Sequence, residues 1–246
     1  MEVEALLAAH NAQIPTQAQV NPLKTDREAL LPQLEESGVT AHPHLWMEGC
    51  LELENTGDLE TLPAFREGLL YIQDAAAKMA VLAAGPKPGM KVLDACAAPG
   101  GKSFAAAAIM ENQGEIISCD LHPHKMKLIE AGAARLGIKC LSTQVMDARK
   151  FEPQWEKAFD LVMADVPCSG LGVIRKKPEI RYRDPRPLEG LPAIQKDILS
   201  NVSRYVRPGG VLLYSTCTLL KRENEDVAWE FLASHKDYSL EPFVLP

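Results

Sequence analysis

The chain has 246 residues, 46% hydrophobic and 24% charged, which suits one sizeable core plus a small additional domain and excludes a disordered or low-complexity protein. Its net charge of −7 argues mildly against a nucleic-acid partner, because phosphate binding depends on lysine and arginine. No segment approaches the length of a membrane span, and the first residues have neither a basic region nor a long apolar run. We therefore expect a cytoplasmic protein with no membrane partner.

Six cysteines occur singly, at positions 50, 96, 119, 140, 168 and 217. They form no C-x-x-C pair and lack histidines at metal-binding spacing, so the sequence predicts neither a zinc site nor a disulfide framework. We expect no bound metal. Each cysteine is either part of the core or an individually reactive thiol.

Residues 1–64 are predicted to form a small α/β unit that precedes a catalytic domain at 65–246. The capping-box pattern Thr25-Asp-Arg-Glu28 predicts a helix that ends at Gly38. Short β-like segments flank this helix at residues 17–20 and 50–53. A further helix at about 73–84 and a turn at 85–89 lead into the second domain.

From residue 90 onward, strand and helix patterns alternate. We predict strands at about 91–95, 115–119, 139–143, 159–164 and 211–216, with helices at about 103–111, 124–136 and 190–206. This alternation is typical of right-handed βαβ units in a parallel sheet, which bind ligands at the carboxyl ends of the strands. One more strand is expected at about 238–244.

The segment from Lys91 to Ser103 is the centre of the second domain: an apolar strand, a loop of small residues and an alanine-rich helix. It is open to three interpretations. The first is an ordinary strand-to-helix connection. The second is a phosphate-binding P-loop, since Gly101-Lys-Ser103 matches the end of that motif, although Cys96 stands where its first glycine belongs. The third is an S-adenosylmethionine pocket, with Asp120, 20 residues beyond Gly100, as the ribose-binding acid.

Polar or reactive side chains follow several of the predicted strands. Asp120, Asp147, Asp165 and Cys217 all fall at or just beyond strand ends. One such aspartate is unremarkable, because aspartate often caps the next helix. Several polar or reactive side chains along one sheet edge favour a shared pocket. Cys168 and Cys217 would both open onto this edge, and Cys217 lies among polar residues that suit an ionised thiol better than a core position does.

A local cluster of positive charge interrupts the acidic average. Between Arg175 and Arg186 there are six lysines and arginines and two acidic residues, within a proline-containing segment. Such a run is most often a solvated loop. Its place beside the predicted catalytic loop favours a polyanion-binding segment.

Four motifs together resemble the RNA 5-methylcytosine methyltransferases. They are Cys96-Ala-Ala-Pro-Gly-Gly-Lys102, Asp165-Val-Pro-Cys168, Arg175-Lys-Lys-Pro178 and Ser215-Thr-Cys-Thr218, the last followed by Glu223-Asn-Glu225. Within that family the chain is most similar to the bacterial Sun or Fmu branch, which Gln73-Asp74 also matches, and the similarity runs from about residue 15 to 243. The resemblance implies a Rossmann-like class I methyltransferase sheet, S-adenosylmethionine as methyl donor and 16S ribosomal RNA as substrate. We expect a monomer.

The resemblance also implies roles for individual residues. Cys217 is the nucleophile, Cys168 assists release of the covalent RNA adduct, and Asp165 hydrogen-bonds the target base. Cofactor contacts fall on Asp120, Asp147 and Asp165 and on the loop residues Cys96, Ala97, Ala98, Pro99, Gly100, Gly101 and Lys102. A nucleophilic thiol is also what the chemistry requires, because carbon 5 of cytosine reacts with a methyl donor only after a thiolate has added to carbon 6.

The chain departs from the family pattern at both ends. It begins after the helical RNA-binding domain that relatives carry, and the last antiparallel strand of the methyltransferase sheet is expected to be missing beyond Pro246. Two other functions stay open at this point: a P-loop nucleotide hydrolase, and a non-catalytic RNA-binding or assembly protein that keeps the fold.

Overall fold

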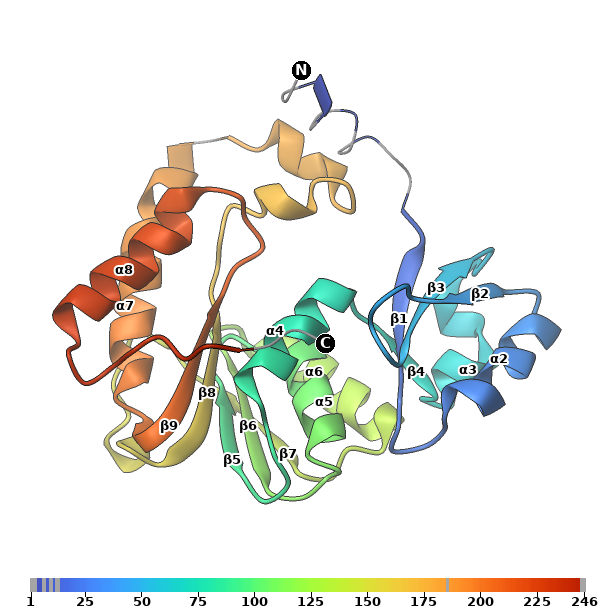
Figure 1. Ribbon diagram of the computed structural model, residues 1–246, viewed down its shortest axis with the longest axis horizontal. Helices are drawn as coiled ribbons and strands as arrows, with labels where there is room; N and C mark the ends of the chain where they lie inside the picture. The colour runs from blue at the N-terminus through green and yellow to red at the C-terminus, as the bar shows by residue number, and fades with distance from the viewer. Residues whose placement is uncertain (1–3, 6–7, 9–10, 12–13, 185, 244–246) are drawn as a thin grey trace.

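The larger domain is built around a parallel sheet. In the computed structural model, which describes residues 4–5, 8, 11, 14–184 and 186–243, five strands of this sheet pair in the order β7-β6-β5-β8-β9 (Figure 1). All pairings between these described strands are parallel. Strand order changes direction between β5 and β8, and sheets of this type bind ligands in the crevice at such a point. The strands are β5 (Lys91–Asp94), β6 (Glu115–Asp120), β7 (Leu141–Val145), β8 (Phe159–Asp165) and β9 (Val206–Ser215).

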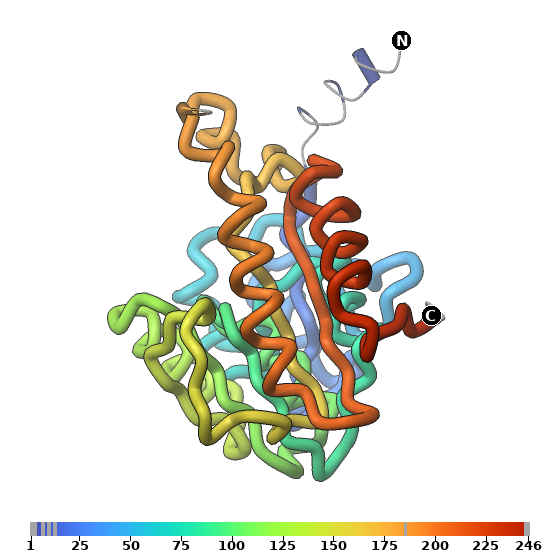
Figure 2. The backbone as a smooth tube through the Cα atoms, turned by 90° about the vertical axis from the view of Figure 1, so that its left-hand side faces the viewer, coloured from blue at the N-terminus to red at the C-terminus, as the bar shows by residue number. Residues whose placement is uncertain are grey.

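Helices cover both faces of this sheet. Three pack on one face: α4 (Ala75–Ala84), α5 (Gly101–Ile109) and α6 (Pro123–Leu136). On the other face lies α7 (Leu191–Ser203), with α8 (Glu225–Ser234) beside it, as Figure 2 shows. A hydrophobic core lies on each face of the sheet, and successive strand residues pack into opposite cores. Val92 packs toward α5, whereas Leu93 packs toward α7. Burial on both faces explains why these strands read as continuous apolar runs.

A smaller antiparallel sheet precedes this domain (Figure 1, right). Among the described residues its strand order is β2-β3-β1-β4. Leucines from α2 and from the strands form its separate core. Its elements are β1 (Thr16–Val20), α2 (Arg27–Glu36), β2 (Thr40–Pro43), β3 (Cys50–Glu54), α3 (Pro63–Arg66) and β4 (Leu70–Ile72).

Single 3-10 turns connect several of these elements. They lie at Leu59–Thr61, Pro153–Trp155, Leu171–Val173, Pro178–Tyr182, Arg186–Gly190 and Lys221–Glu223. Across the described residues, no helix is both long and apolar enough to span a bilayer.

The small sheet is fastened to α6 by polar contacts, of which those of Asn21 are buried. The Asn21 Nδ2 group donates to the main-chain oxygens of Gly68 and Leu136, both at 2.8 Å. Lys24 Nζ donates to the Arg135 carbonyl at 2.7 Å. A Cβ on Gly68 would lie only 1.9 Å from that same Arg135 oxygen, so the close approach requires glycine. The two sheets are therefore docked at close range through α6.

Some sequence expectations for the small sheet are wrong in detail. The boundary expected at residue 64 falls before β4, yet β4 pairs with β1 and belongs to the N-terminal sheet. Strand β2 was not expected at all. The cap of α2 is Asp26, whose carboxylate accepts from the Ala29 N–H at 2.8 Å, and not the predicted Thr25.

The larger sheet differs from expectation at its end. Strand β9 begins at Val206, earlier than the predicted 211, with a register irregularity opposite β8. The strand expected at 238–244 is wrong for the described residues 238–243, which form no strand; Val244 lies outside the described residues. Tyr238 is held elsewhere, because its hydroxyl donates to the Ser203 carbonyl of α7 at 2.6 Å.

Candidate active site

The loop from Cys96 to Lys102 joins β5 to α5 at the carboxyl edge of the sheet. Gly100 has φ +110°, and a Cβ there would lie 2.5 Å from the Phe104 ring, so glycine is required at this position. No described side chain caps α5. The amino end of α5 therefore offers partial positive charge to a negatively charged ligand group at the loop.

Three buried side chains next to this loop are joined by hydrogen bonds. The Ser103 hydroxyl donates to Asp94 Oδ2 at 2.7 Å, and the Ser118 hydroxyl donates to Ser103 at 2.7 Å. Asp94 is fully buried, and burial raises the pKa of its carboxyl to about 6. Because Ser103 is buried and committed to Asp94, it is not placed to hold a magnesium ion as a P-loop serine does. Asp94 was missed by sequence reasoning, although a carboxylate at the end of a buried strand was a usable signal.

Two of the predicted cofactor acids already have partners of their own. Asp120, at the end of β6, lies 3.3 Å from Lys125 Nζ and accepts from the His122 N–H at 3.1 Å. Asp147, two residues beyond β7, accepts a bidentate contact from Arg149 at 2.9 Å for each nitrogen. These hydrogen bonds from Arg149 hold the pKa of Asp147 below its usual value. Both carboxylates are thus held in place at the sheet edge by neighbouring donors.

Lys102 and Asp165 meet across the crevice between β5 and β8. The Lys102 ammonium lies 2.6 Å from Asp165 Oδ2, and the Ser215 hydroxyl donates to Asp165 Oδ1 at 2.9 Å. Asp165 ends β8 and Ser215 ends β9, so neighbouring strands converge on one carboxylate. Side chains from the 96–102 segment, β8 and β9 are thereby in direct contact with one another.

The two cysteines that follow β8 and β9 are in contact. Cys168 Sγ and Cys217 Sγ lie 3.2 Å apart, and the main-chain N–H of Cys217 donates to Cys168 Sγ, also at 3.2 Å. Cys217 is exposed and Cys168 is partly buried. The structure thus brings together two thiols that are 49 positions apart in the sequence.

Their contact makes the two thiols chemically different. The hydrogen bond from Cys217 lowers the pKa of Cys168 to about 7, against the opposing effect of burial. The same hydrogen bond, reinforced by burial, raises the pKa of Cys217. Cys168 is therefore the thiol that ionises first, and Cys217 holds its proton and donates it in a hydrogen bond to the Cys168 thiolate. In contrast, burial raises the pKa of Cys96 and of Cys119, so neither thiol is activated as a nucleophile.

A cavity of about 940 Å³ lies beside Lys102 and Asp165. Its lining comes from five parts of the chain: Asn11 with residues 14–17, residues 72–77, the loop at 97–102, Asp165, and residues 174–178 with Arg181. Of the predicted cofactor residues, the lining includes Ala97, Ala98, Pro99, Gly101, Lys102 and Asp165. Asp120, Asp147 and both thiols stand outside this lining. The cavity thus joins the loop at residues 97–102 to the basic segment.

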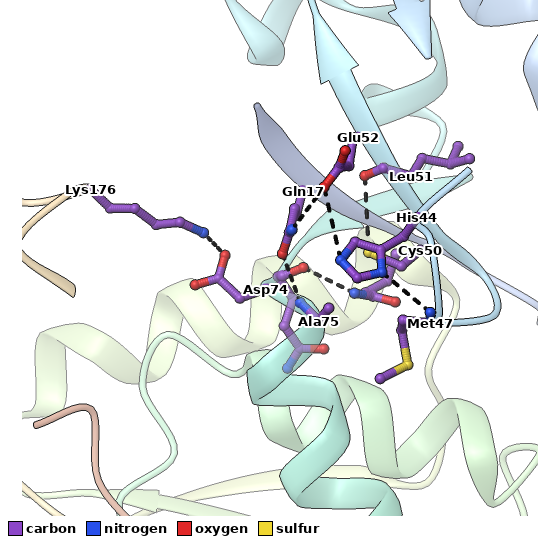
Figure 3. A network of polar contacts seen from close by, with 11 residues as sticks. Gln17, His44, Met47, Cys50, Leu51, Glu52, Asp74, Ala75 and Lys176 are labelled. Atoms are coloured by element: carbon purple, nitrogen blue, oxygen red, sulfur yellow. Dashed lines mark hydrogen bonds and ion pairs between the residues drawn. The ribbon is translucent and has the colours of Figure 1, made fainter. Parts of the chain in front are cut away.

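One wall of the cavity is set by the N-terminal sheet (Figure 3). Gln17 accepts from the Ala75 N–H at 2.9 Å at the start of α4, and its amide donates to Glu52 at 3.3 Å. Asp74, beside this contact, forms an ion pair with Lys176 of the basic segment. The ion pair links the two walls of the cavity. Within the described residues, no cluster of His, Cys, Asp and Glu is arranged to hold a metal ion.

Comparison with known proteins identifies relatives along the whole chain. Residues 80–246 match the model of the 16S rRNA methyltransferase RsmB/F family, and residues 1–60 match its ferredoxin-like domain. A probable ribosomal RNA small subunit methyltransferase B from Bacillus subtilis is 41% identical over 89% of this chain and 49% of that protein. Its counterpart from Synechocystis is 35% identical over 98% of this chain and 55% of that protein. The chain spans about half the length of the curated relatives it matches.

Solved structures agree with this assignment. A methyltransferase homolog from Pyrococcus horikoshii is 29% identical, with a TM-score of 0.79 over 92% of this chain and 72% of that one. NSun6 from the same organism, solved with SFG, shares the fold at a TM-score of 0.86 and 23% identity, over 95% of this chain and 83% of that one. The chain belongs to the 16S rRNA methyltransferase RsmB/F family, a family of S-adenosylmethionine-dependent methyltransferases.

Proposed function

We propose that this protein transfers a methyl group from S-adenosylmethionine to carbon 5 of a cytosine in 16S ribosomal RNA, through a covalent adduct with Cys217. The observation that carries the proposal is the thiol pair of Cys168 and Cys217, which follows the same two strand ends that hold Asp165 and Ser215. Methyl transfer to an oxygen or to an exocyclic nitrogen needs no such pair of thiols. Carbon 5 of cytosine does need a nucleophile on carbon 6.

The residues at the sheet edge fit the donor chemically. The amino end of α5 suits its carboxylate, and the buried Asp120 suits a ribose diol. S-adenosylmethionine supplies a methyl group on a positively charged sulfonium, and Asp165 is the negative group of the site. Cys96, Asp147 and the loop residues up to Lys102 complete the proposed cofactor contacts.

The thiol pair supports a specific order of proton transfers. As the Cys217 sulfur bonds to carbon 6, its proton becomes acidic and passes to the Cys168 thiolate, whose sulfur lies 3.2 Å away. The carbon 5–carbon 6 electron pair then forms the new bond from carbon 5 to the methyl group. Because the pKa of Cys168 is about 7, its proton is lost to water at neutral pH, and the thiolate takes the proton from carbon 5. The returning electron pair expels Cys217.

In the proposal, Asp165 and Lys102 hold the base during these steps. In the proposal, Asp165 accepts a hydrogen bond from the base, which is held out of its stack. Lys102, 2.6 Å from Asp165, offsets negative charge that develops on the ring. The basic segment 175–186 and the N-terminal sheet would grip the RNA backbone and loop bases.

The test is incubation with labelled S-adenosylmethionine and unmodified small-subunit RNA, followed by mapping of 5-methylcytosine. A label on carbon 5 of a cytosine that depends on Cys217 supports the proposal. A label on another atom or another RNA would refute the substrate assignment. RNA binding without methyl transfer, with cofactor in excess, would favour a non-catalytic binding protein instead.

A further inference from the structure

A buried carboxylate joins the two segments that carry the thiols. Glu223 lies in the 3-10 turn after Cys217 and has no exposed surface. Its Oε2 accepts from the main-chain N–H of Ser169, the residue after Cys168, at 2.8 Å. The same oxygen accepts from Gln195 Nε2 of α7 at 3.1 Å.

Further contacts extend this connection to both sides of Cys168 and to the residue after Cys217. Gln195 also donates to the carbonyl of Pro167, the residue before Cys168, at 2.9 Å. The hydroxyls of Ser169 and Thr218 lie 2.6 Å apart, and Thr218 is the residue after Cys217. The chain on either side of Cys168 is thereby tied to α7 and to the Cys217 segment.

Stability alone does not account for a carboxylate at this position. A buried charge costs free energy unless it is paired, and Glu223 Oε1 has no hydrogen-bond partner among the described residues. A charged acceptor does, however, bind a main-chain N–H more strongly than a neutral one. The group held in this way is the residue next to a reactive thiol.

We propose that Glu223 is a positioning residue for the two-cysteine site: its carboxylate fixes the main chain after Cys168 and keeps the Cys168 thiol in contact with Cys217. This role rests on the proposed function, in which the two thiols exchange a proton. Glu223 touches neither thiol in the contacts described, so it acts through Ser169.

Glu223 influences Cys168 in two opposite directions. Through Ser169 it maintains the hydrogen bond from Cys217, which is the main cause that lowers the pKa of Cys168. Its own negative charge raises that pKa, as a smaller effect. The other ionisable groups around the thiol pair are Tyr214, Asp165 and Lys102. Substitutions that remove only the charge, or both the charge and the acceptor, separate these two effects.

The experiment measures the alkylation rate of Cys168 by iodoacetamide from pH 5 to 10, followed by peptide mass spectrometry. It uses the whole protein without RNA or cofactor. Glu223→Gln keeps the shape and an acceptor oxygen but removes the charge, whereas Glu223→Ala removes both. Glu225→Ala, at the exposed glutamate two positions along, is the matched control. Thermal unfolding of each variant verifies that the protein is folded.

With Glu223→Ala, we expect the alkylation midpoint of Cys168 to rise from about 7 toward the ordinary thiol value, about 8.5, with alkylation at pH 7 about tenfold slower. With Glu223→Gln the midpoint should stay or fall, and with Glu225→Ala it should not move. A Glu223→Ala midpoint that stays or falls would overturn the positioning role. So would a Glu223→Gln midpoint that rises as far as that of Glu223→Ala. Because neither RNA nor methyl transfer enters this assay, failure of the proposed function shows separately, as absent 5-methylcytosine with the alkylation shifts intact.

Discussion

Gly68 offers a direct test of how the N-terminal sheet is docked. It has φ +74°, so Gly68→Ala costs about 1–2 kcal/mol from the left-handed backbone alone. The new Cβ would also lie 1.9 Å from the Arg135 carbonyl oxygen. Main-chain atoms cannot rotate out of the way, so the sheet must shift away from α6. That shift breaks the Lys24 and Asn21 contacts, each worth about 1 kcal/mol.

The matched control is Gly38→Ala. Gly38 has nearly the same φ, +77°, but in the described part of the chain no neighbouring atom lies within 4 Å of the point that a Cβ would occupy. Gly38→Ala should therefore lower the free energy of unfolding only by the cost of the left-handed backbone. Urea or thermal denaturation measures the difference, which we expect to be at least about 2 kcal/mol, or at least about 4 °C in Tm for a chain of this size. Hydrogen exchange should show the extra loss at residues 65–72 and 135–138. Equal losses in the two variants would refute the close docking.

The remaining predictions concern the active site and the end of the chain. Cys217→Ala should abolish methylation without any RNA adduct, whereas Cys168→Ala should accumulate a protein–RNA species that survives denaturing electrophoresis and disappears when Cys217 is also replaced. If the protein–RNA species accumulated in Cys217→Ala instead, Cys168 would be the nucleophile. Asp120→Ala should weaken S-adenosylmethionine binding roughly tenfold or more, since a charge-assisted hydrogen bond is worth about 1.5–3 kcal/mol; an unchanged dissociation constant measured by calorimetry would remove Asp120 from the pocket. Amides in residues 239–243 should exchange hydrogen faster than those in 211–214, because only the latter pair with a strand; equal protection would contradict the absence of a strand.

The central architecture was predictable from sequence because its signals are local. The parallel strands β5, β6 and β8 are buried apolar runs that end in polar residues, and the predicted bounds of each are within one residue of those observed. The start of β9 was missed because Pro208, Gly209 and Gly210 resemble a turn. In the structure they lie inside the strand, where Gly209 adopts φ +77° beside the register irregularity.

The features that escaped prediction depend on contacts far apart in the chain. Strand β4 has only three residues and is defined by its pairing with β1, so no local pattern marks it. Glu223 looks like an ordinary charged residue in a polar turn, and only the fold places it beside Ser169, 54 positions away. The contact between the two thiols likewise arises from the adjacency of β8 and β9.

The docking of the N-terminal sheet on α6 has a consequence for how the RNA of the proposed function would enter. Asn21 and Lys24 hold the sheet to α6, and Gln17 holds the start of α4, so the wall of the cavity on that side is tied by hydrogen bonds to the domain that contains the loop at residues 96–102. The opposite wall comes from the basic segment, which faces it through the partly exposed ion pair of Lys176 with Asp74. A phosphate that competes for Lys176 would release this wall while the other stays in place. For the RNA of the proposed function, entry at this cavity would therefore begin with a phosphate replacing Asp74 as the partner of Lys176.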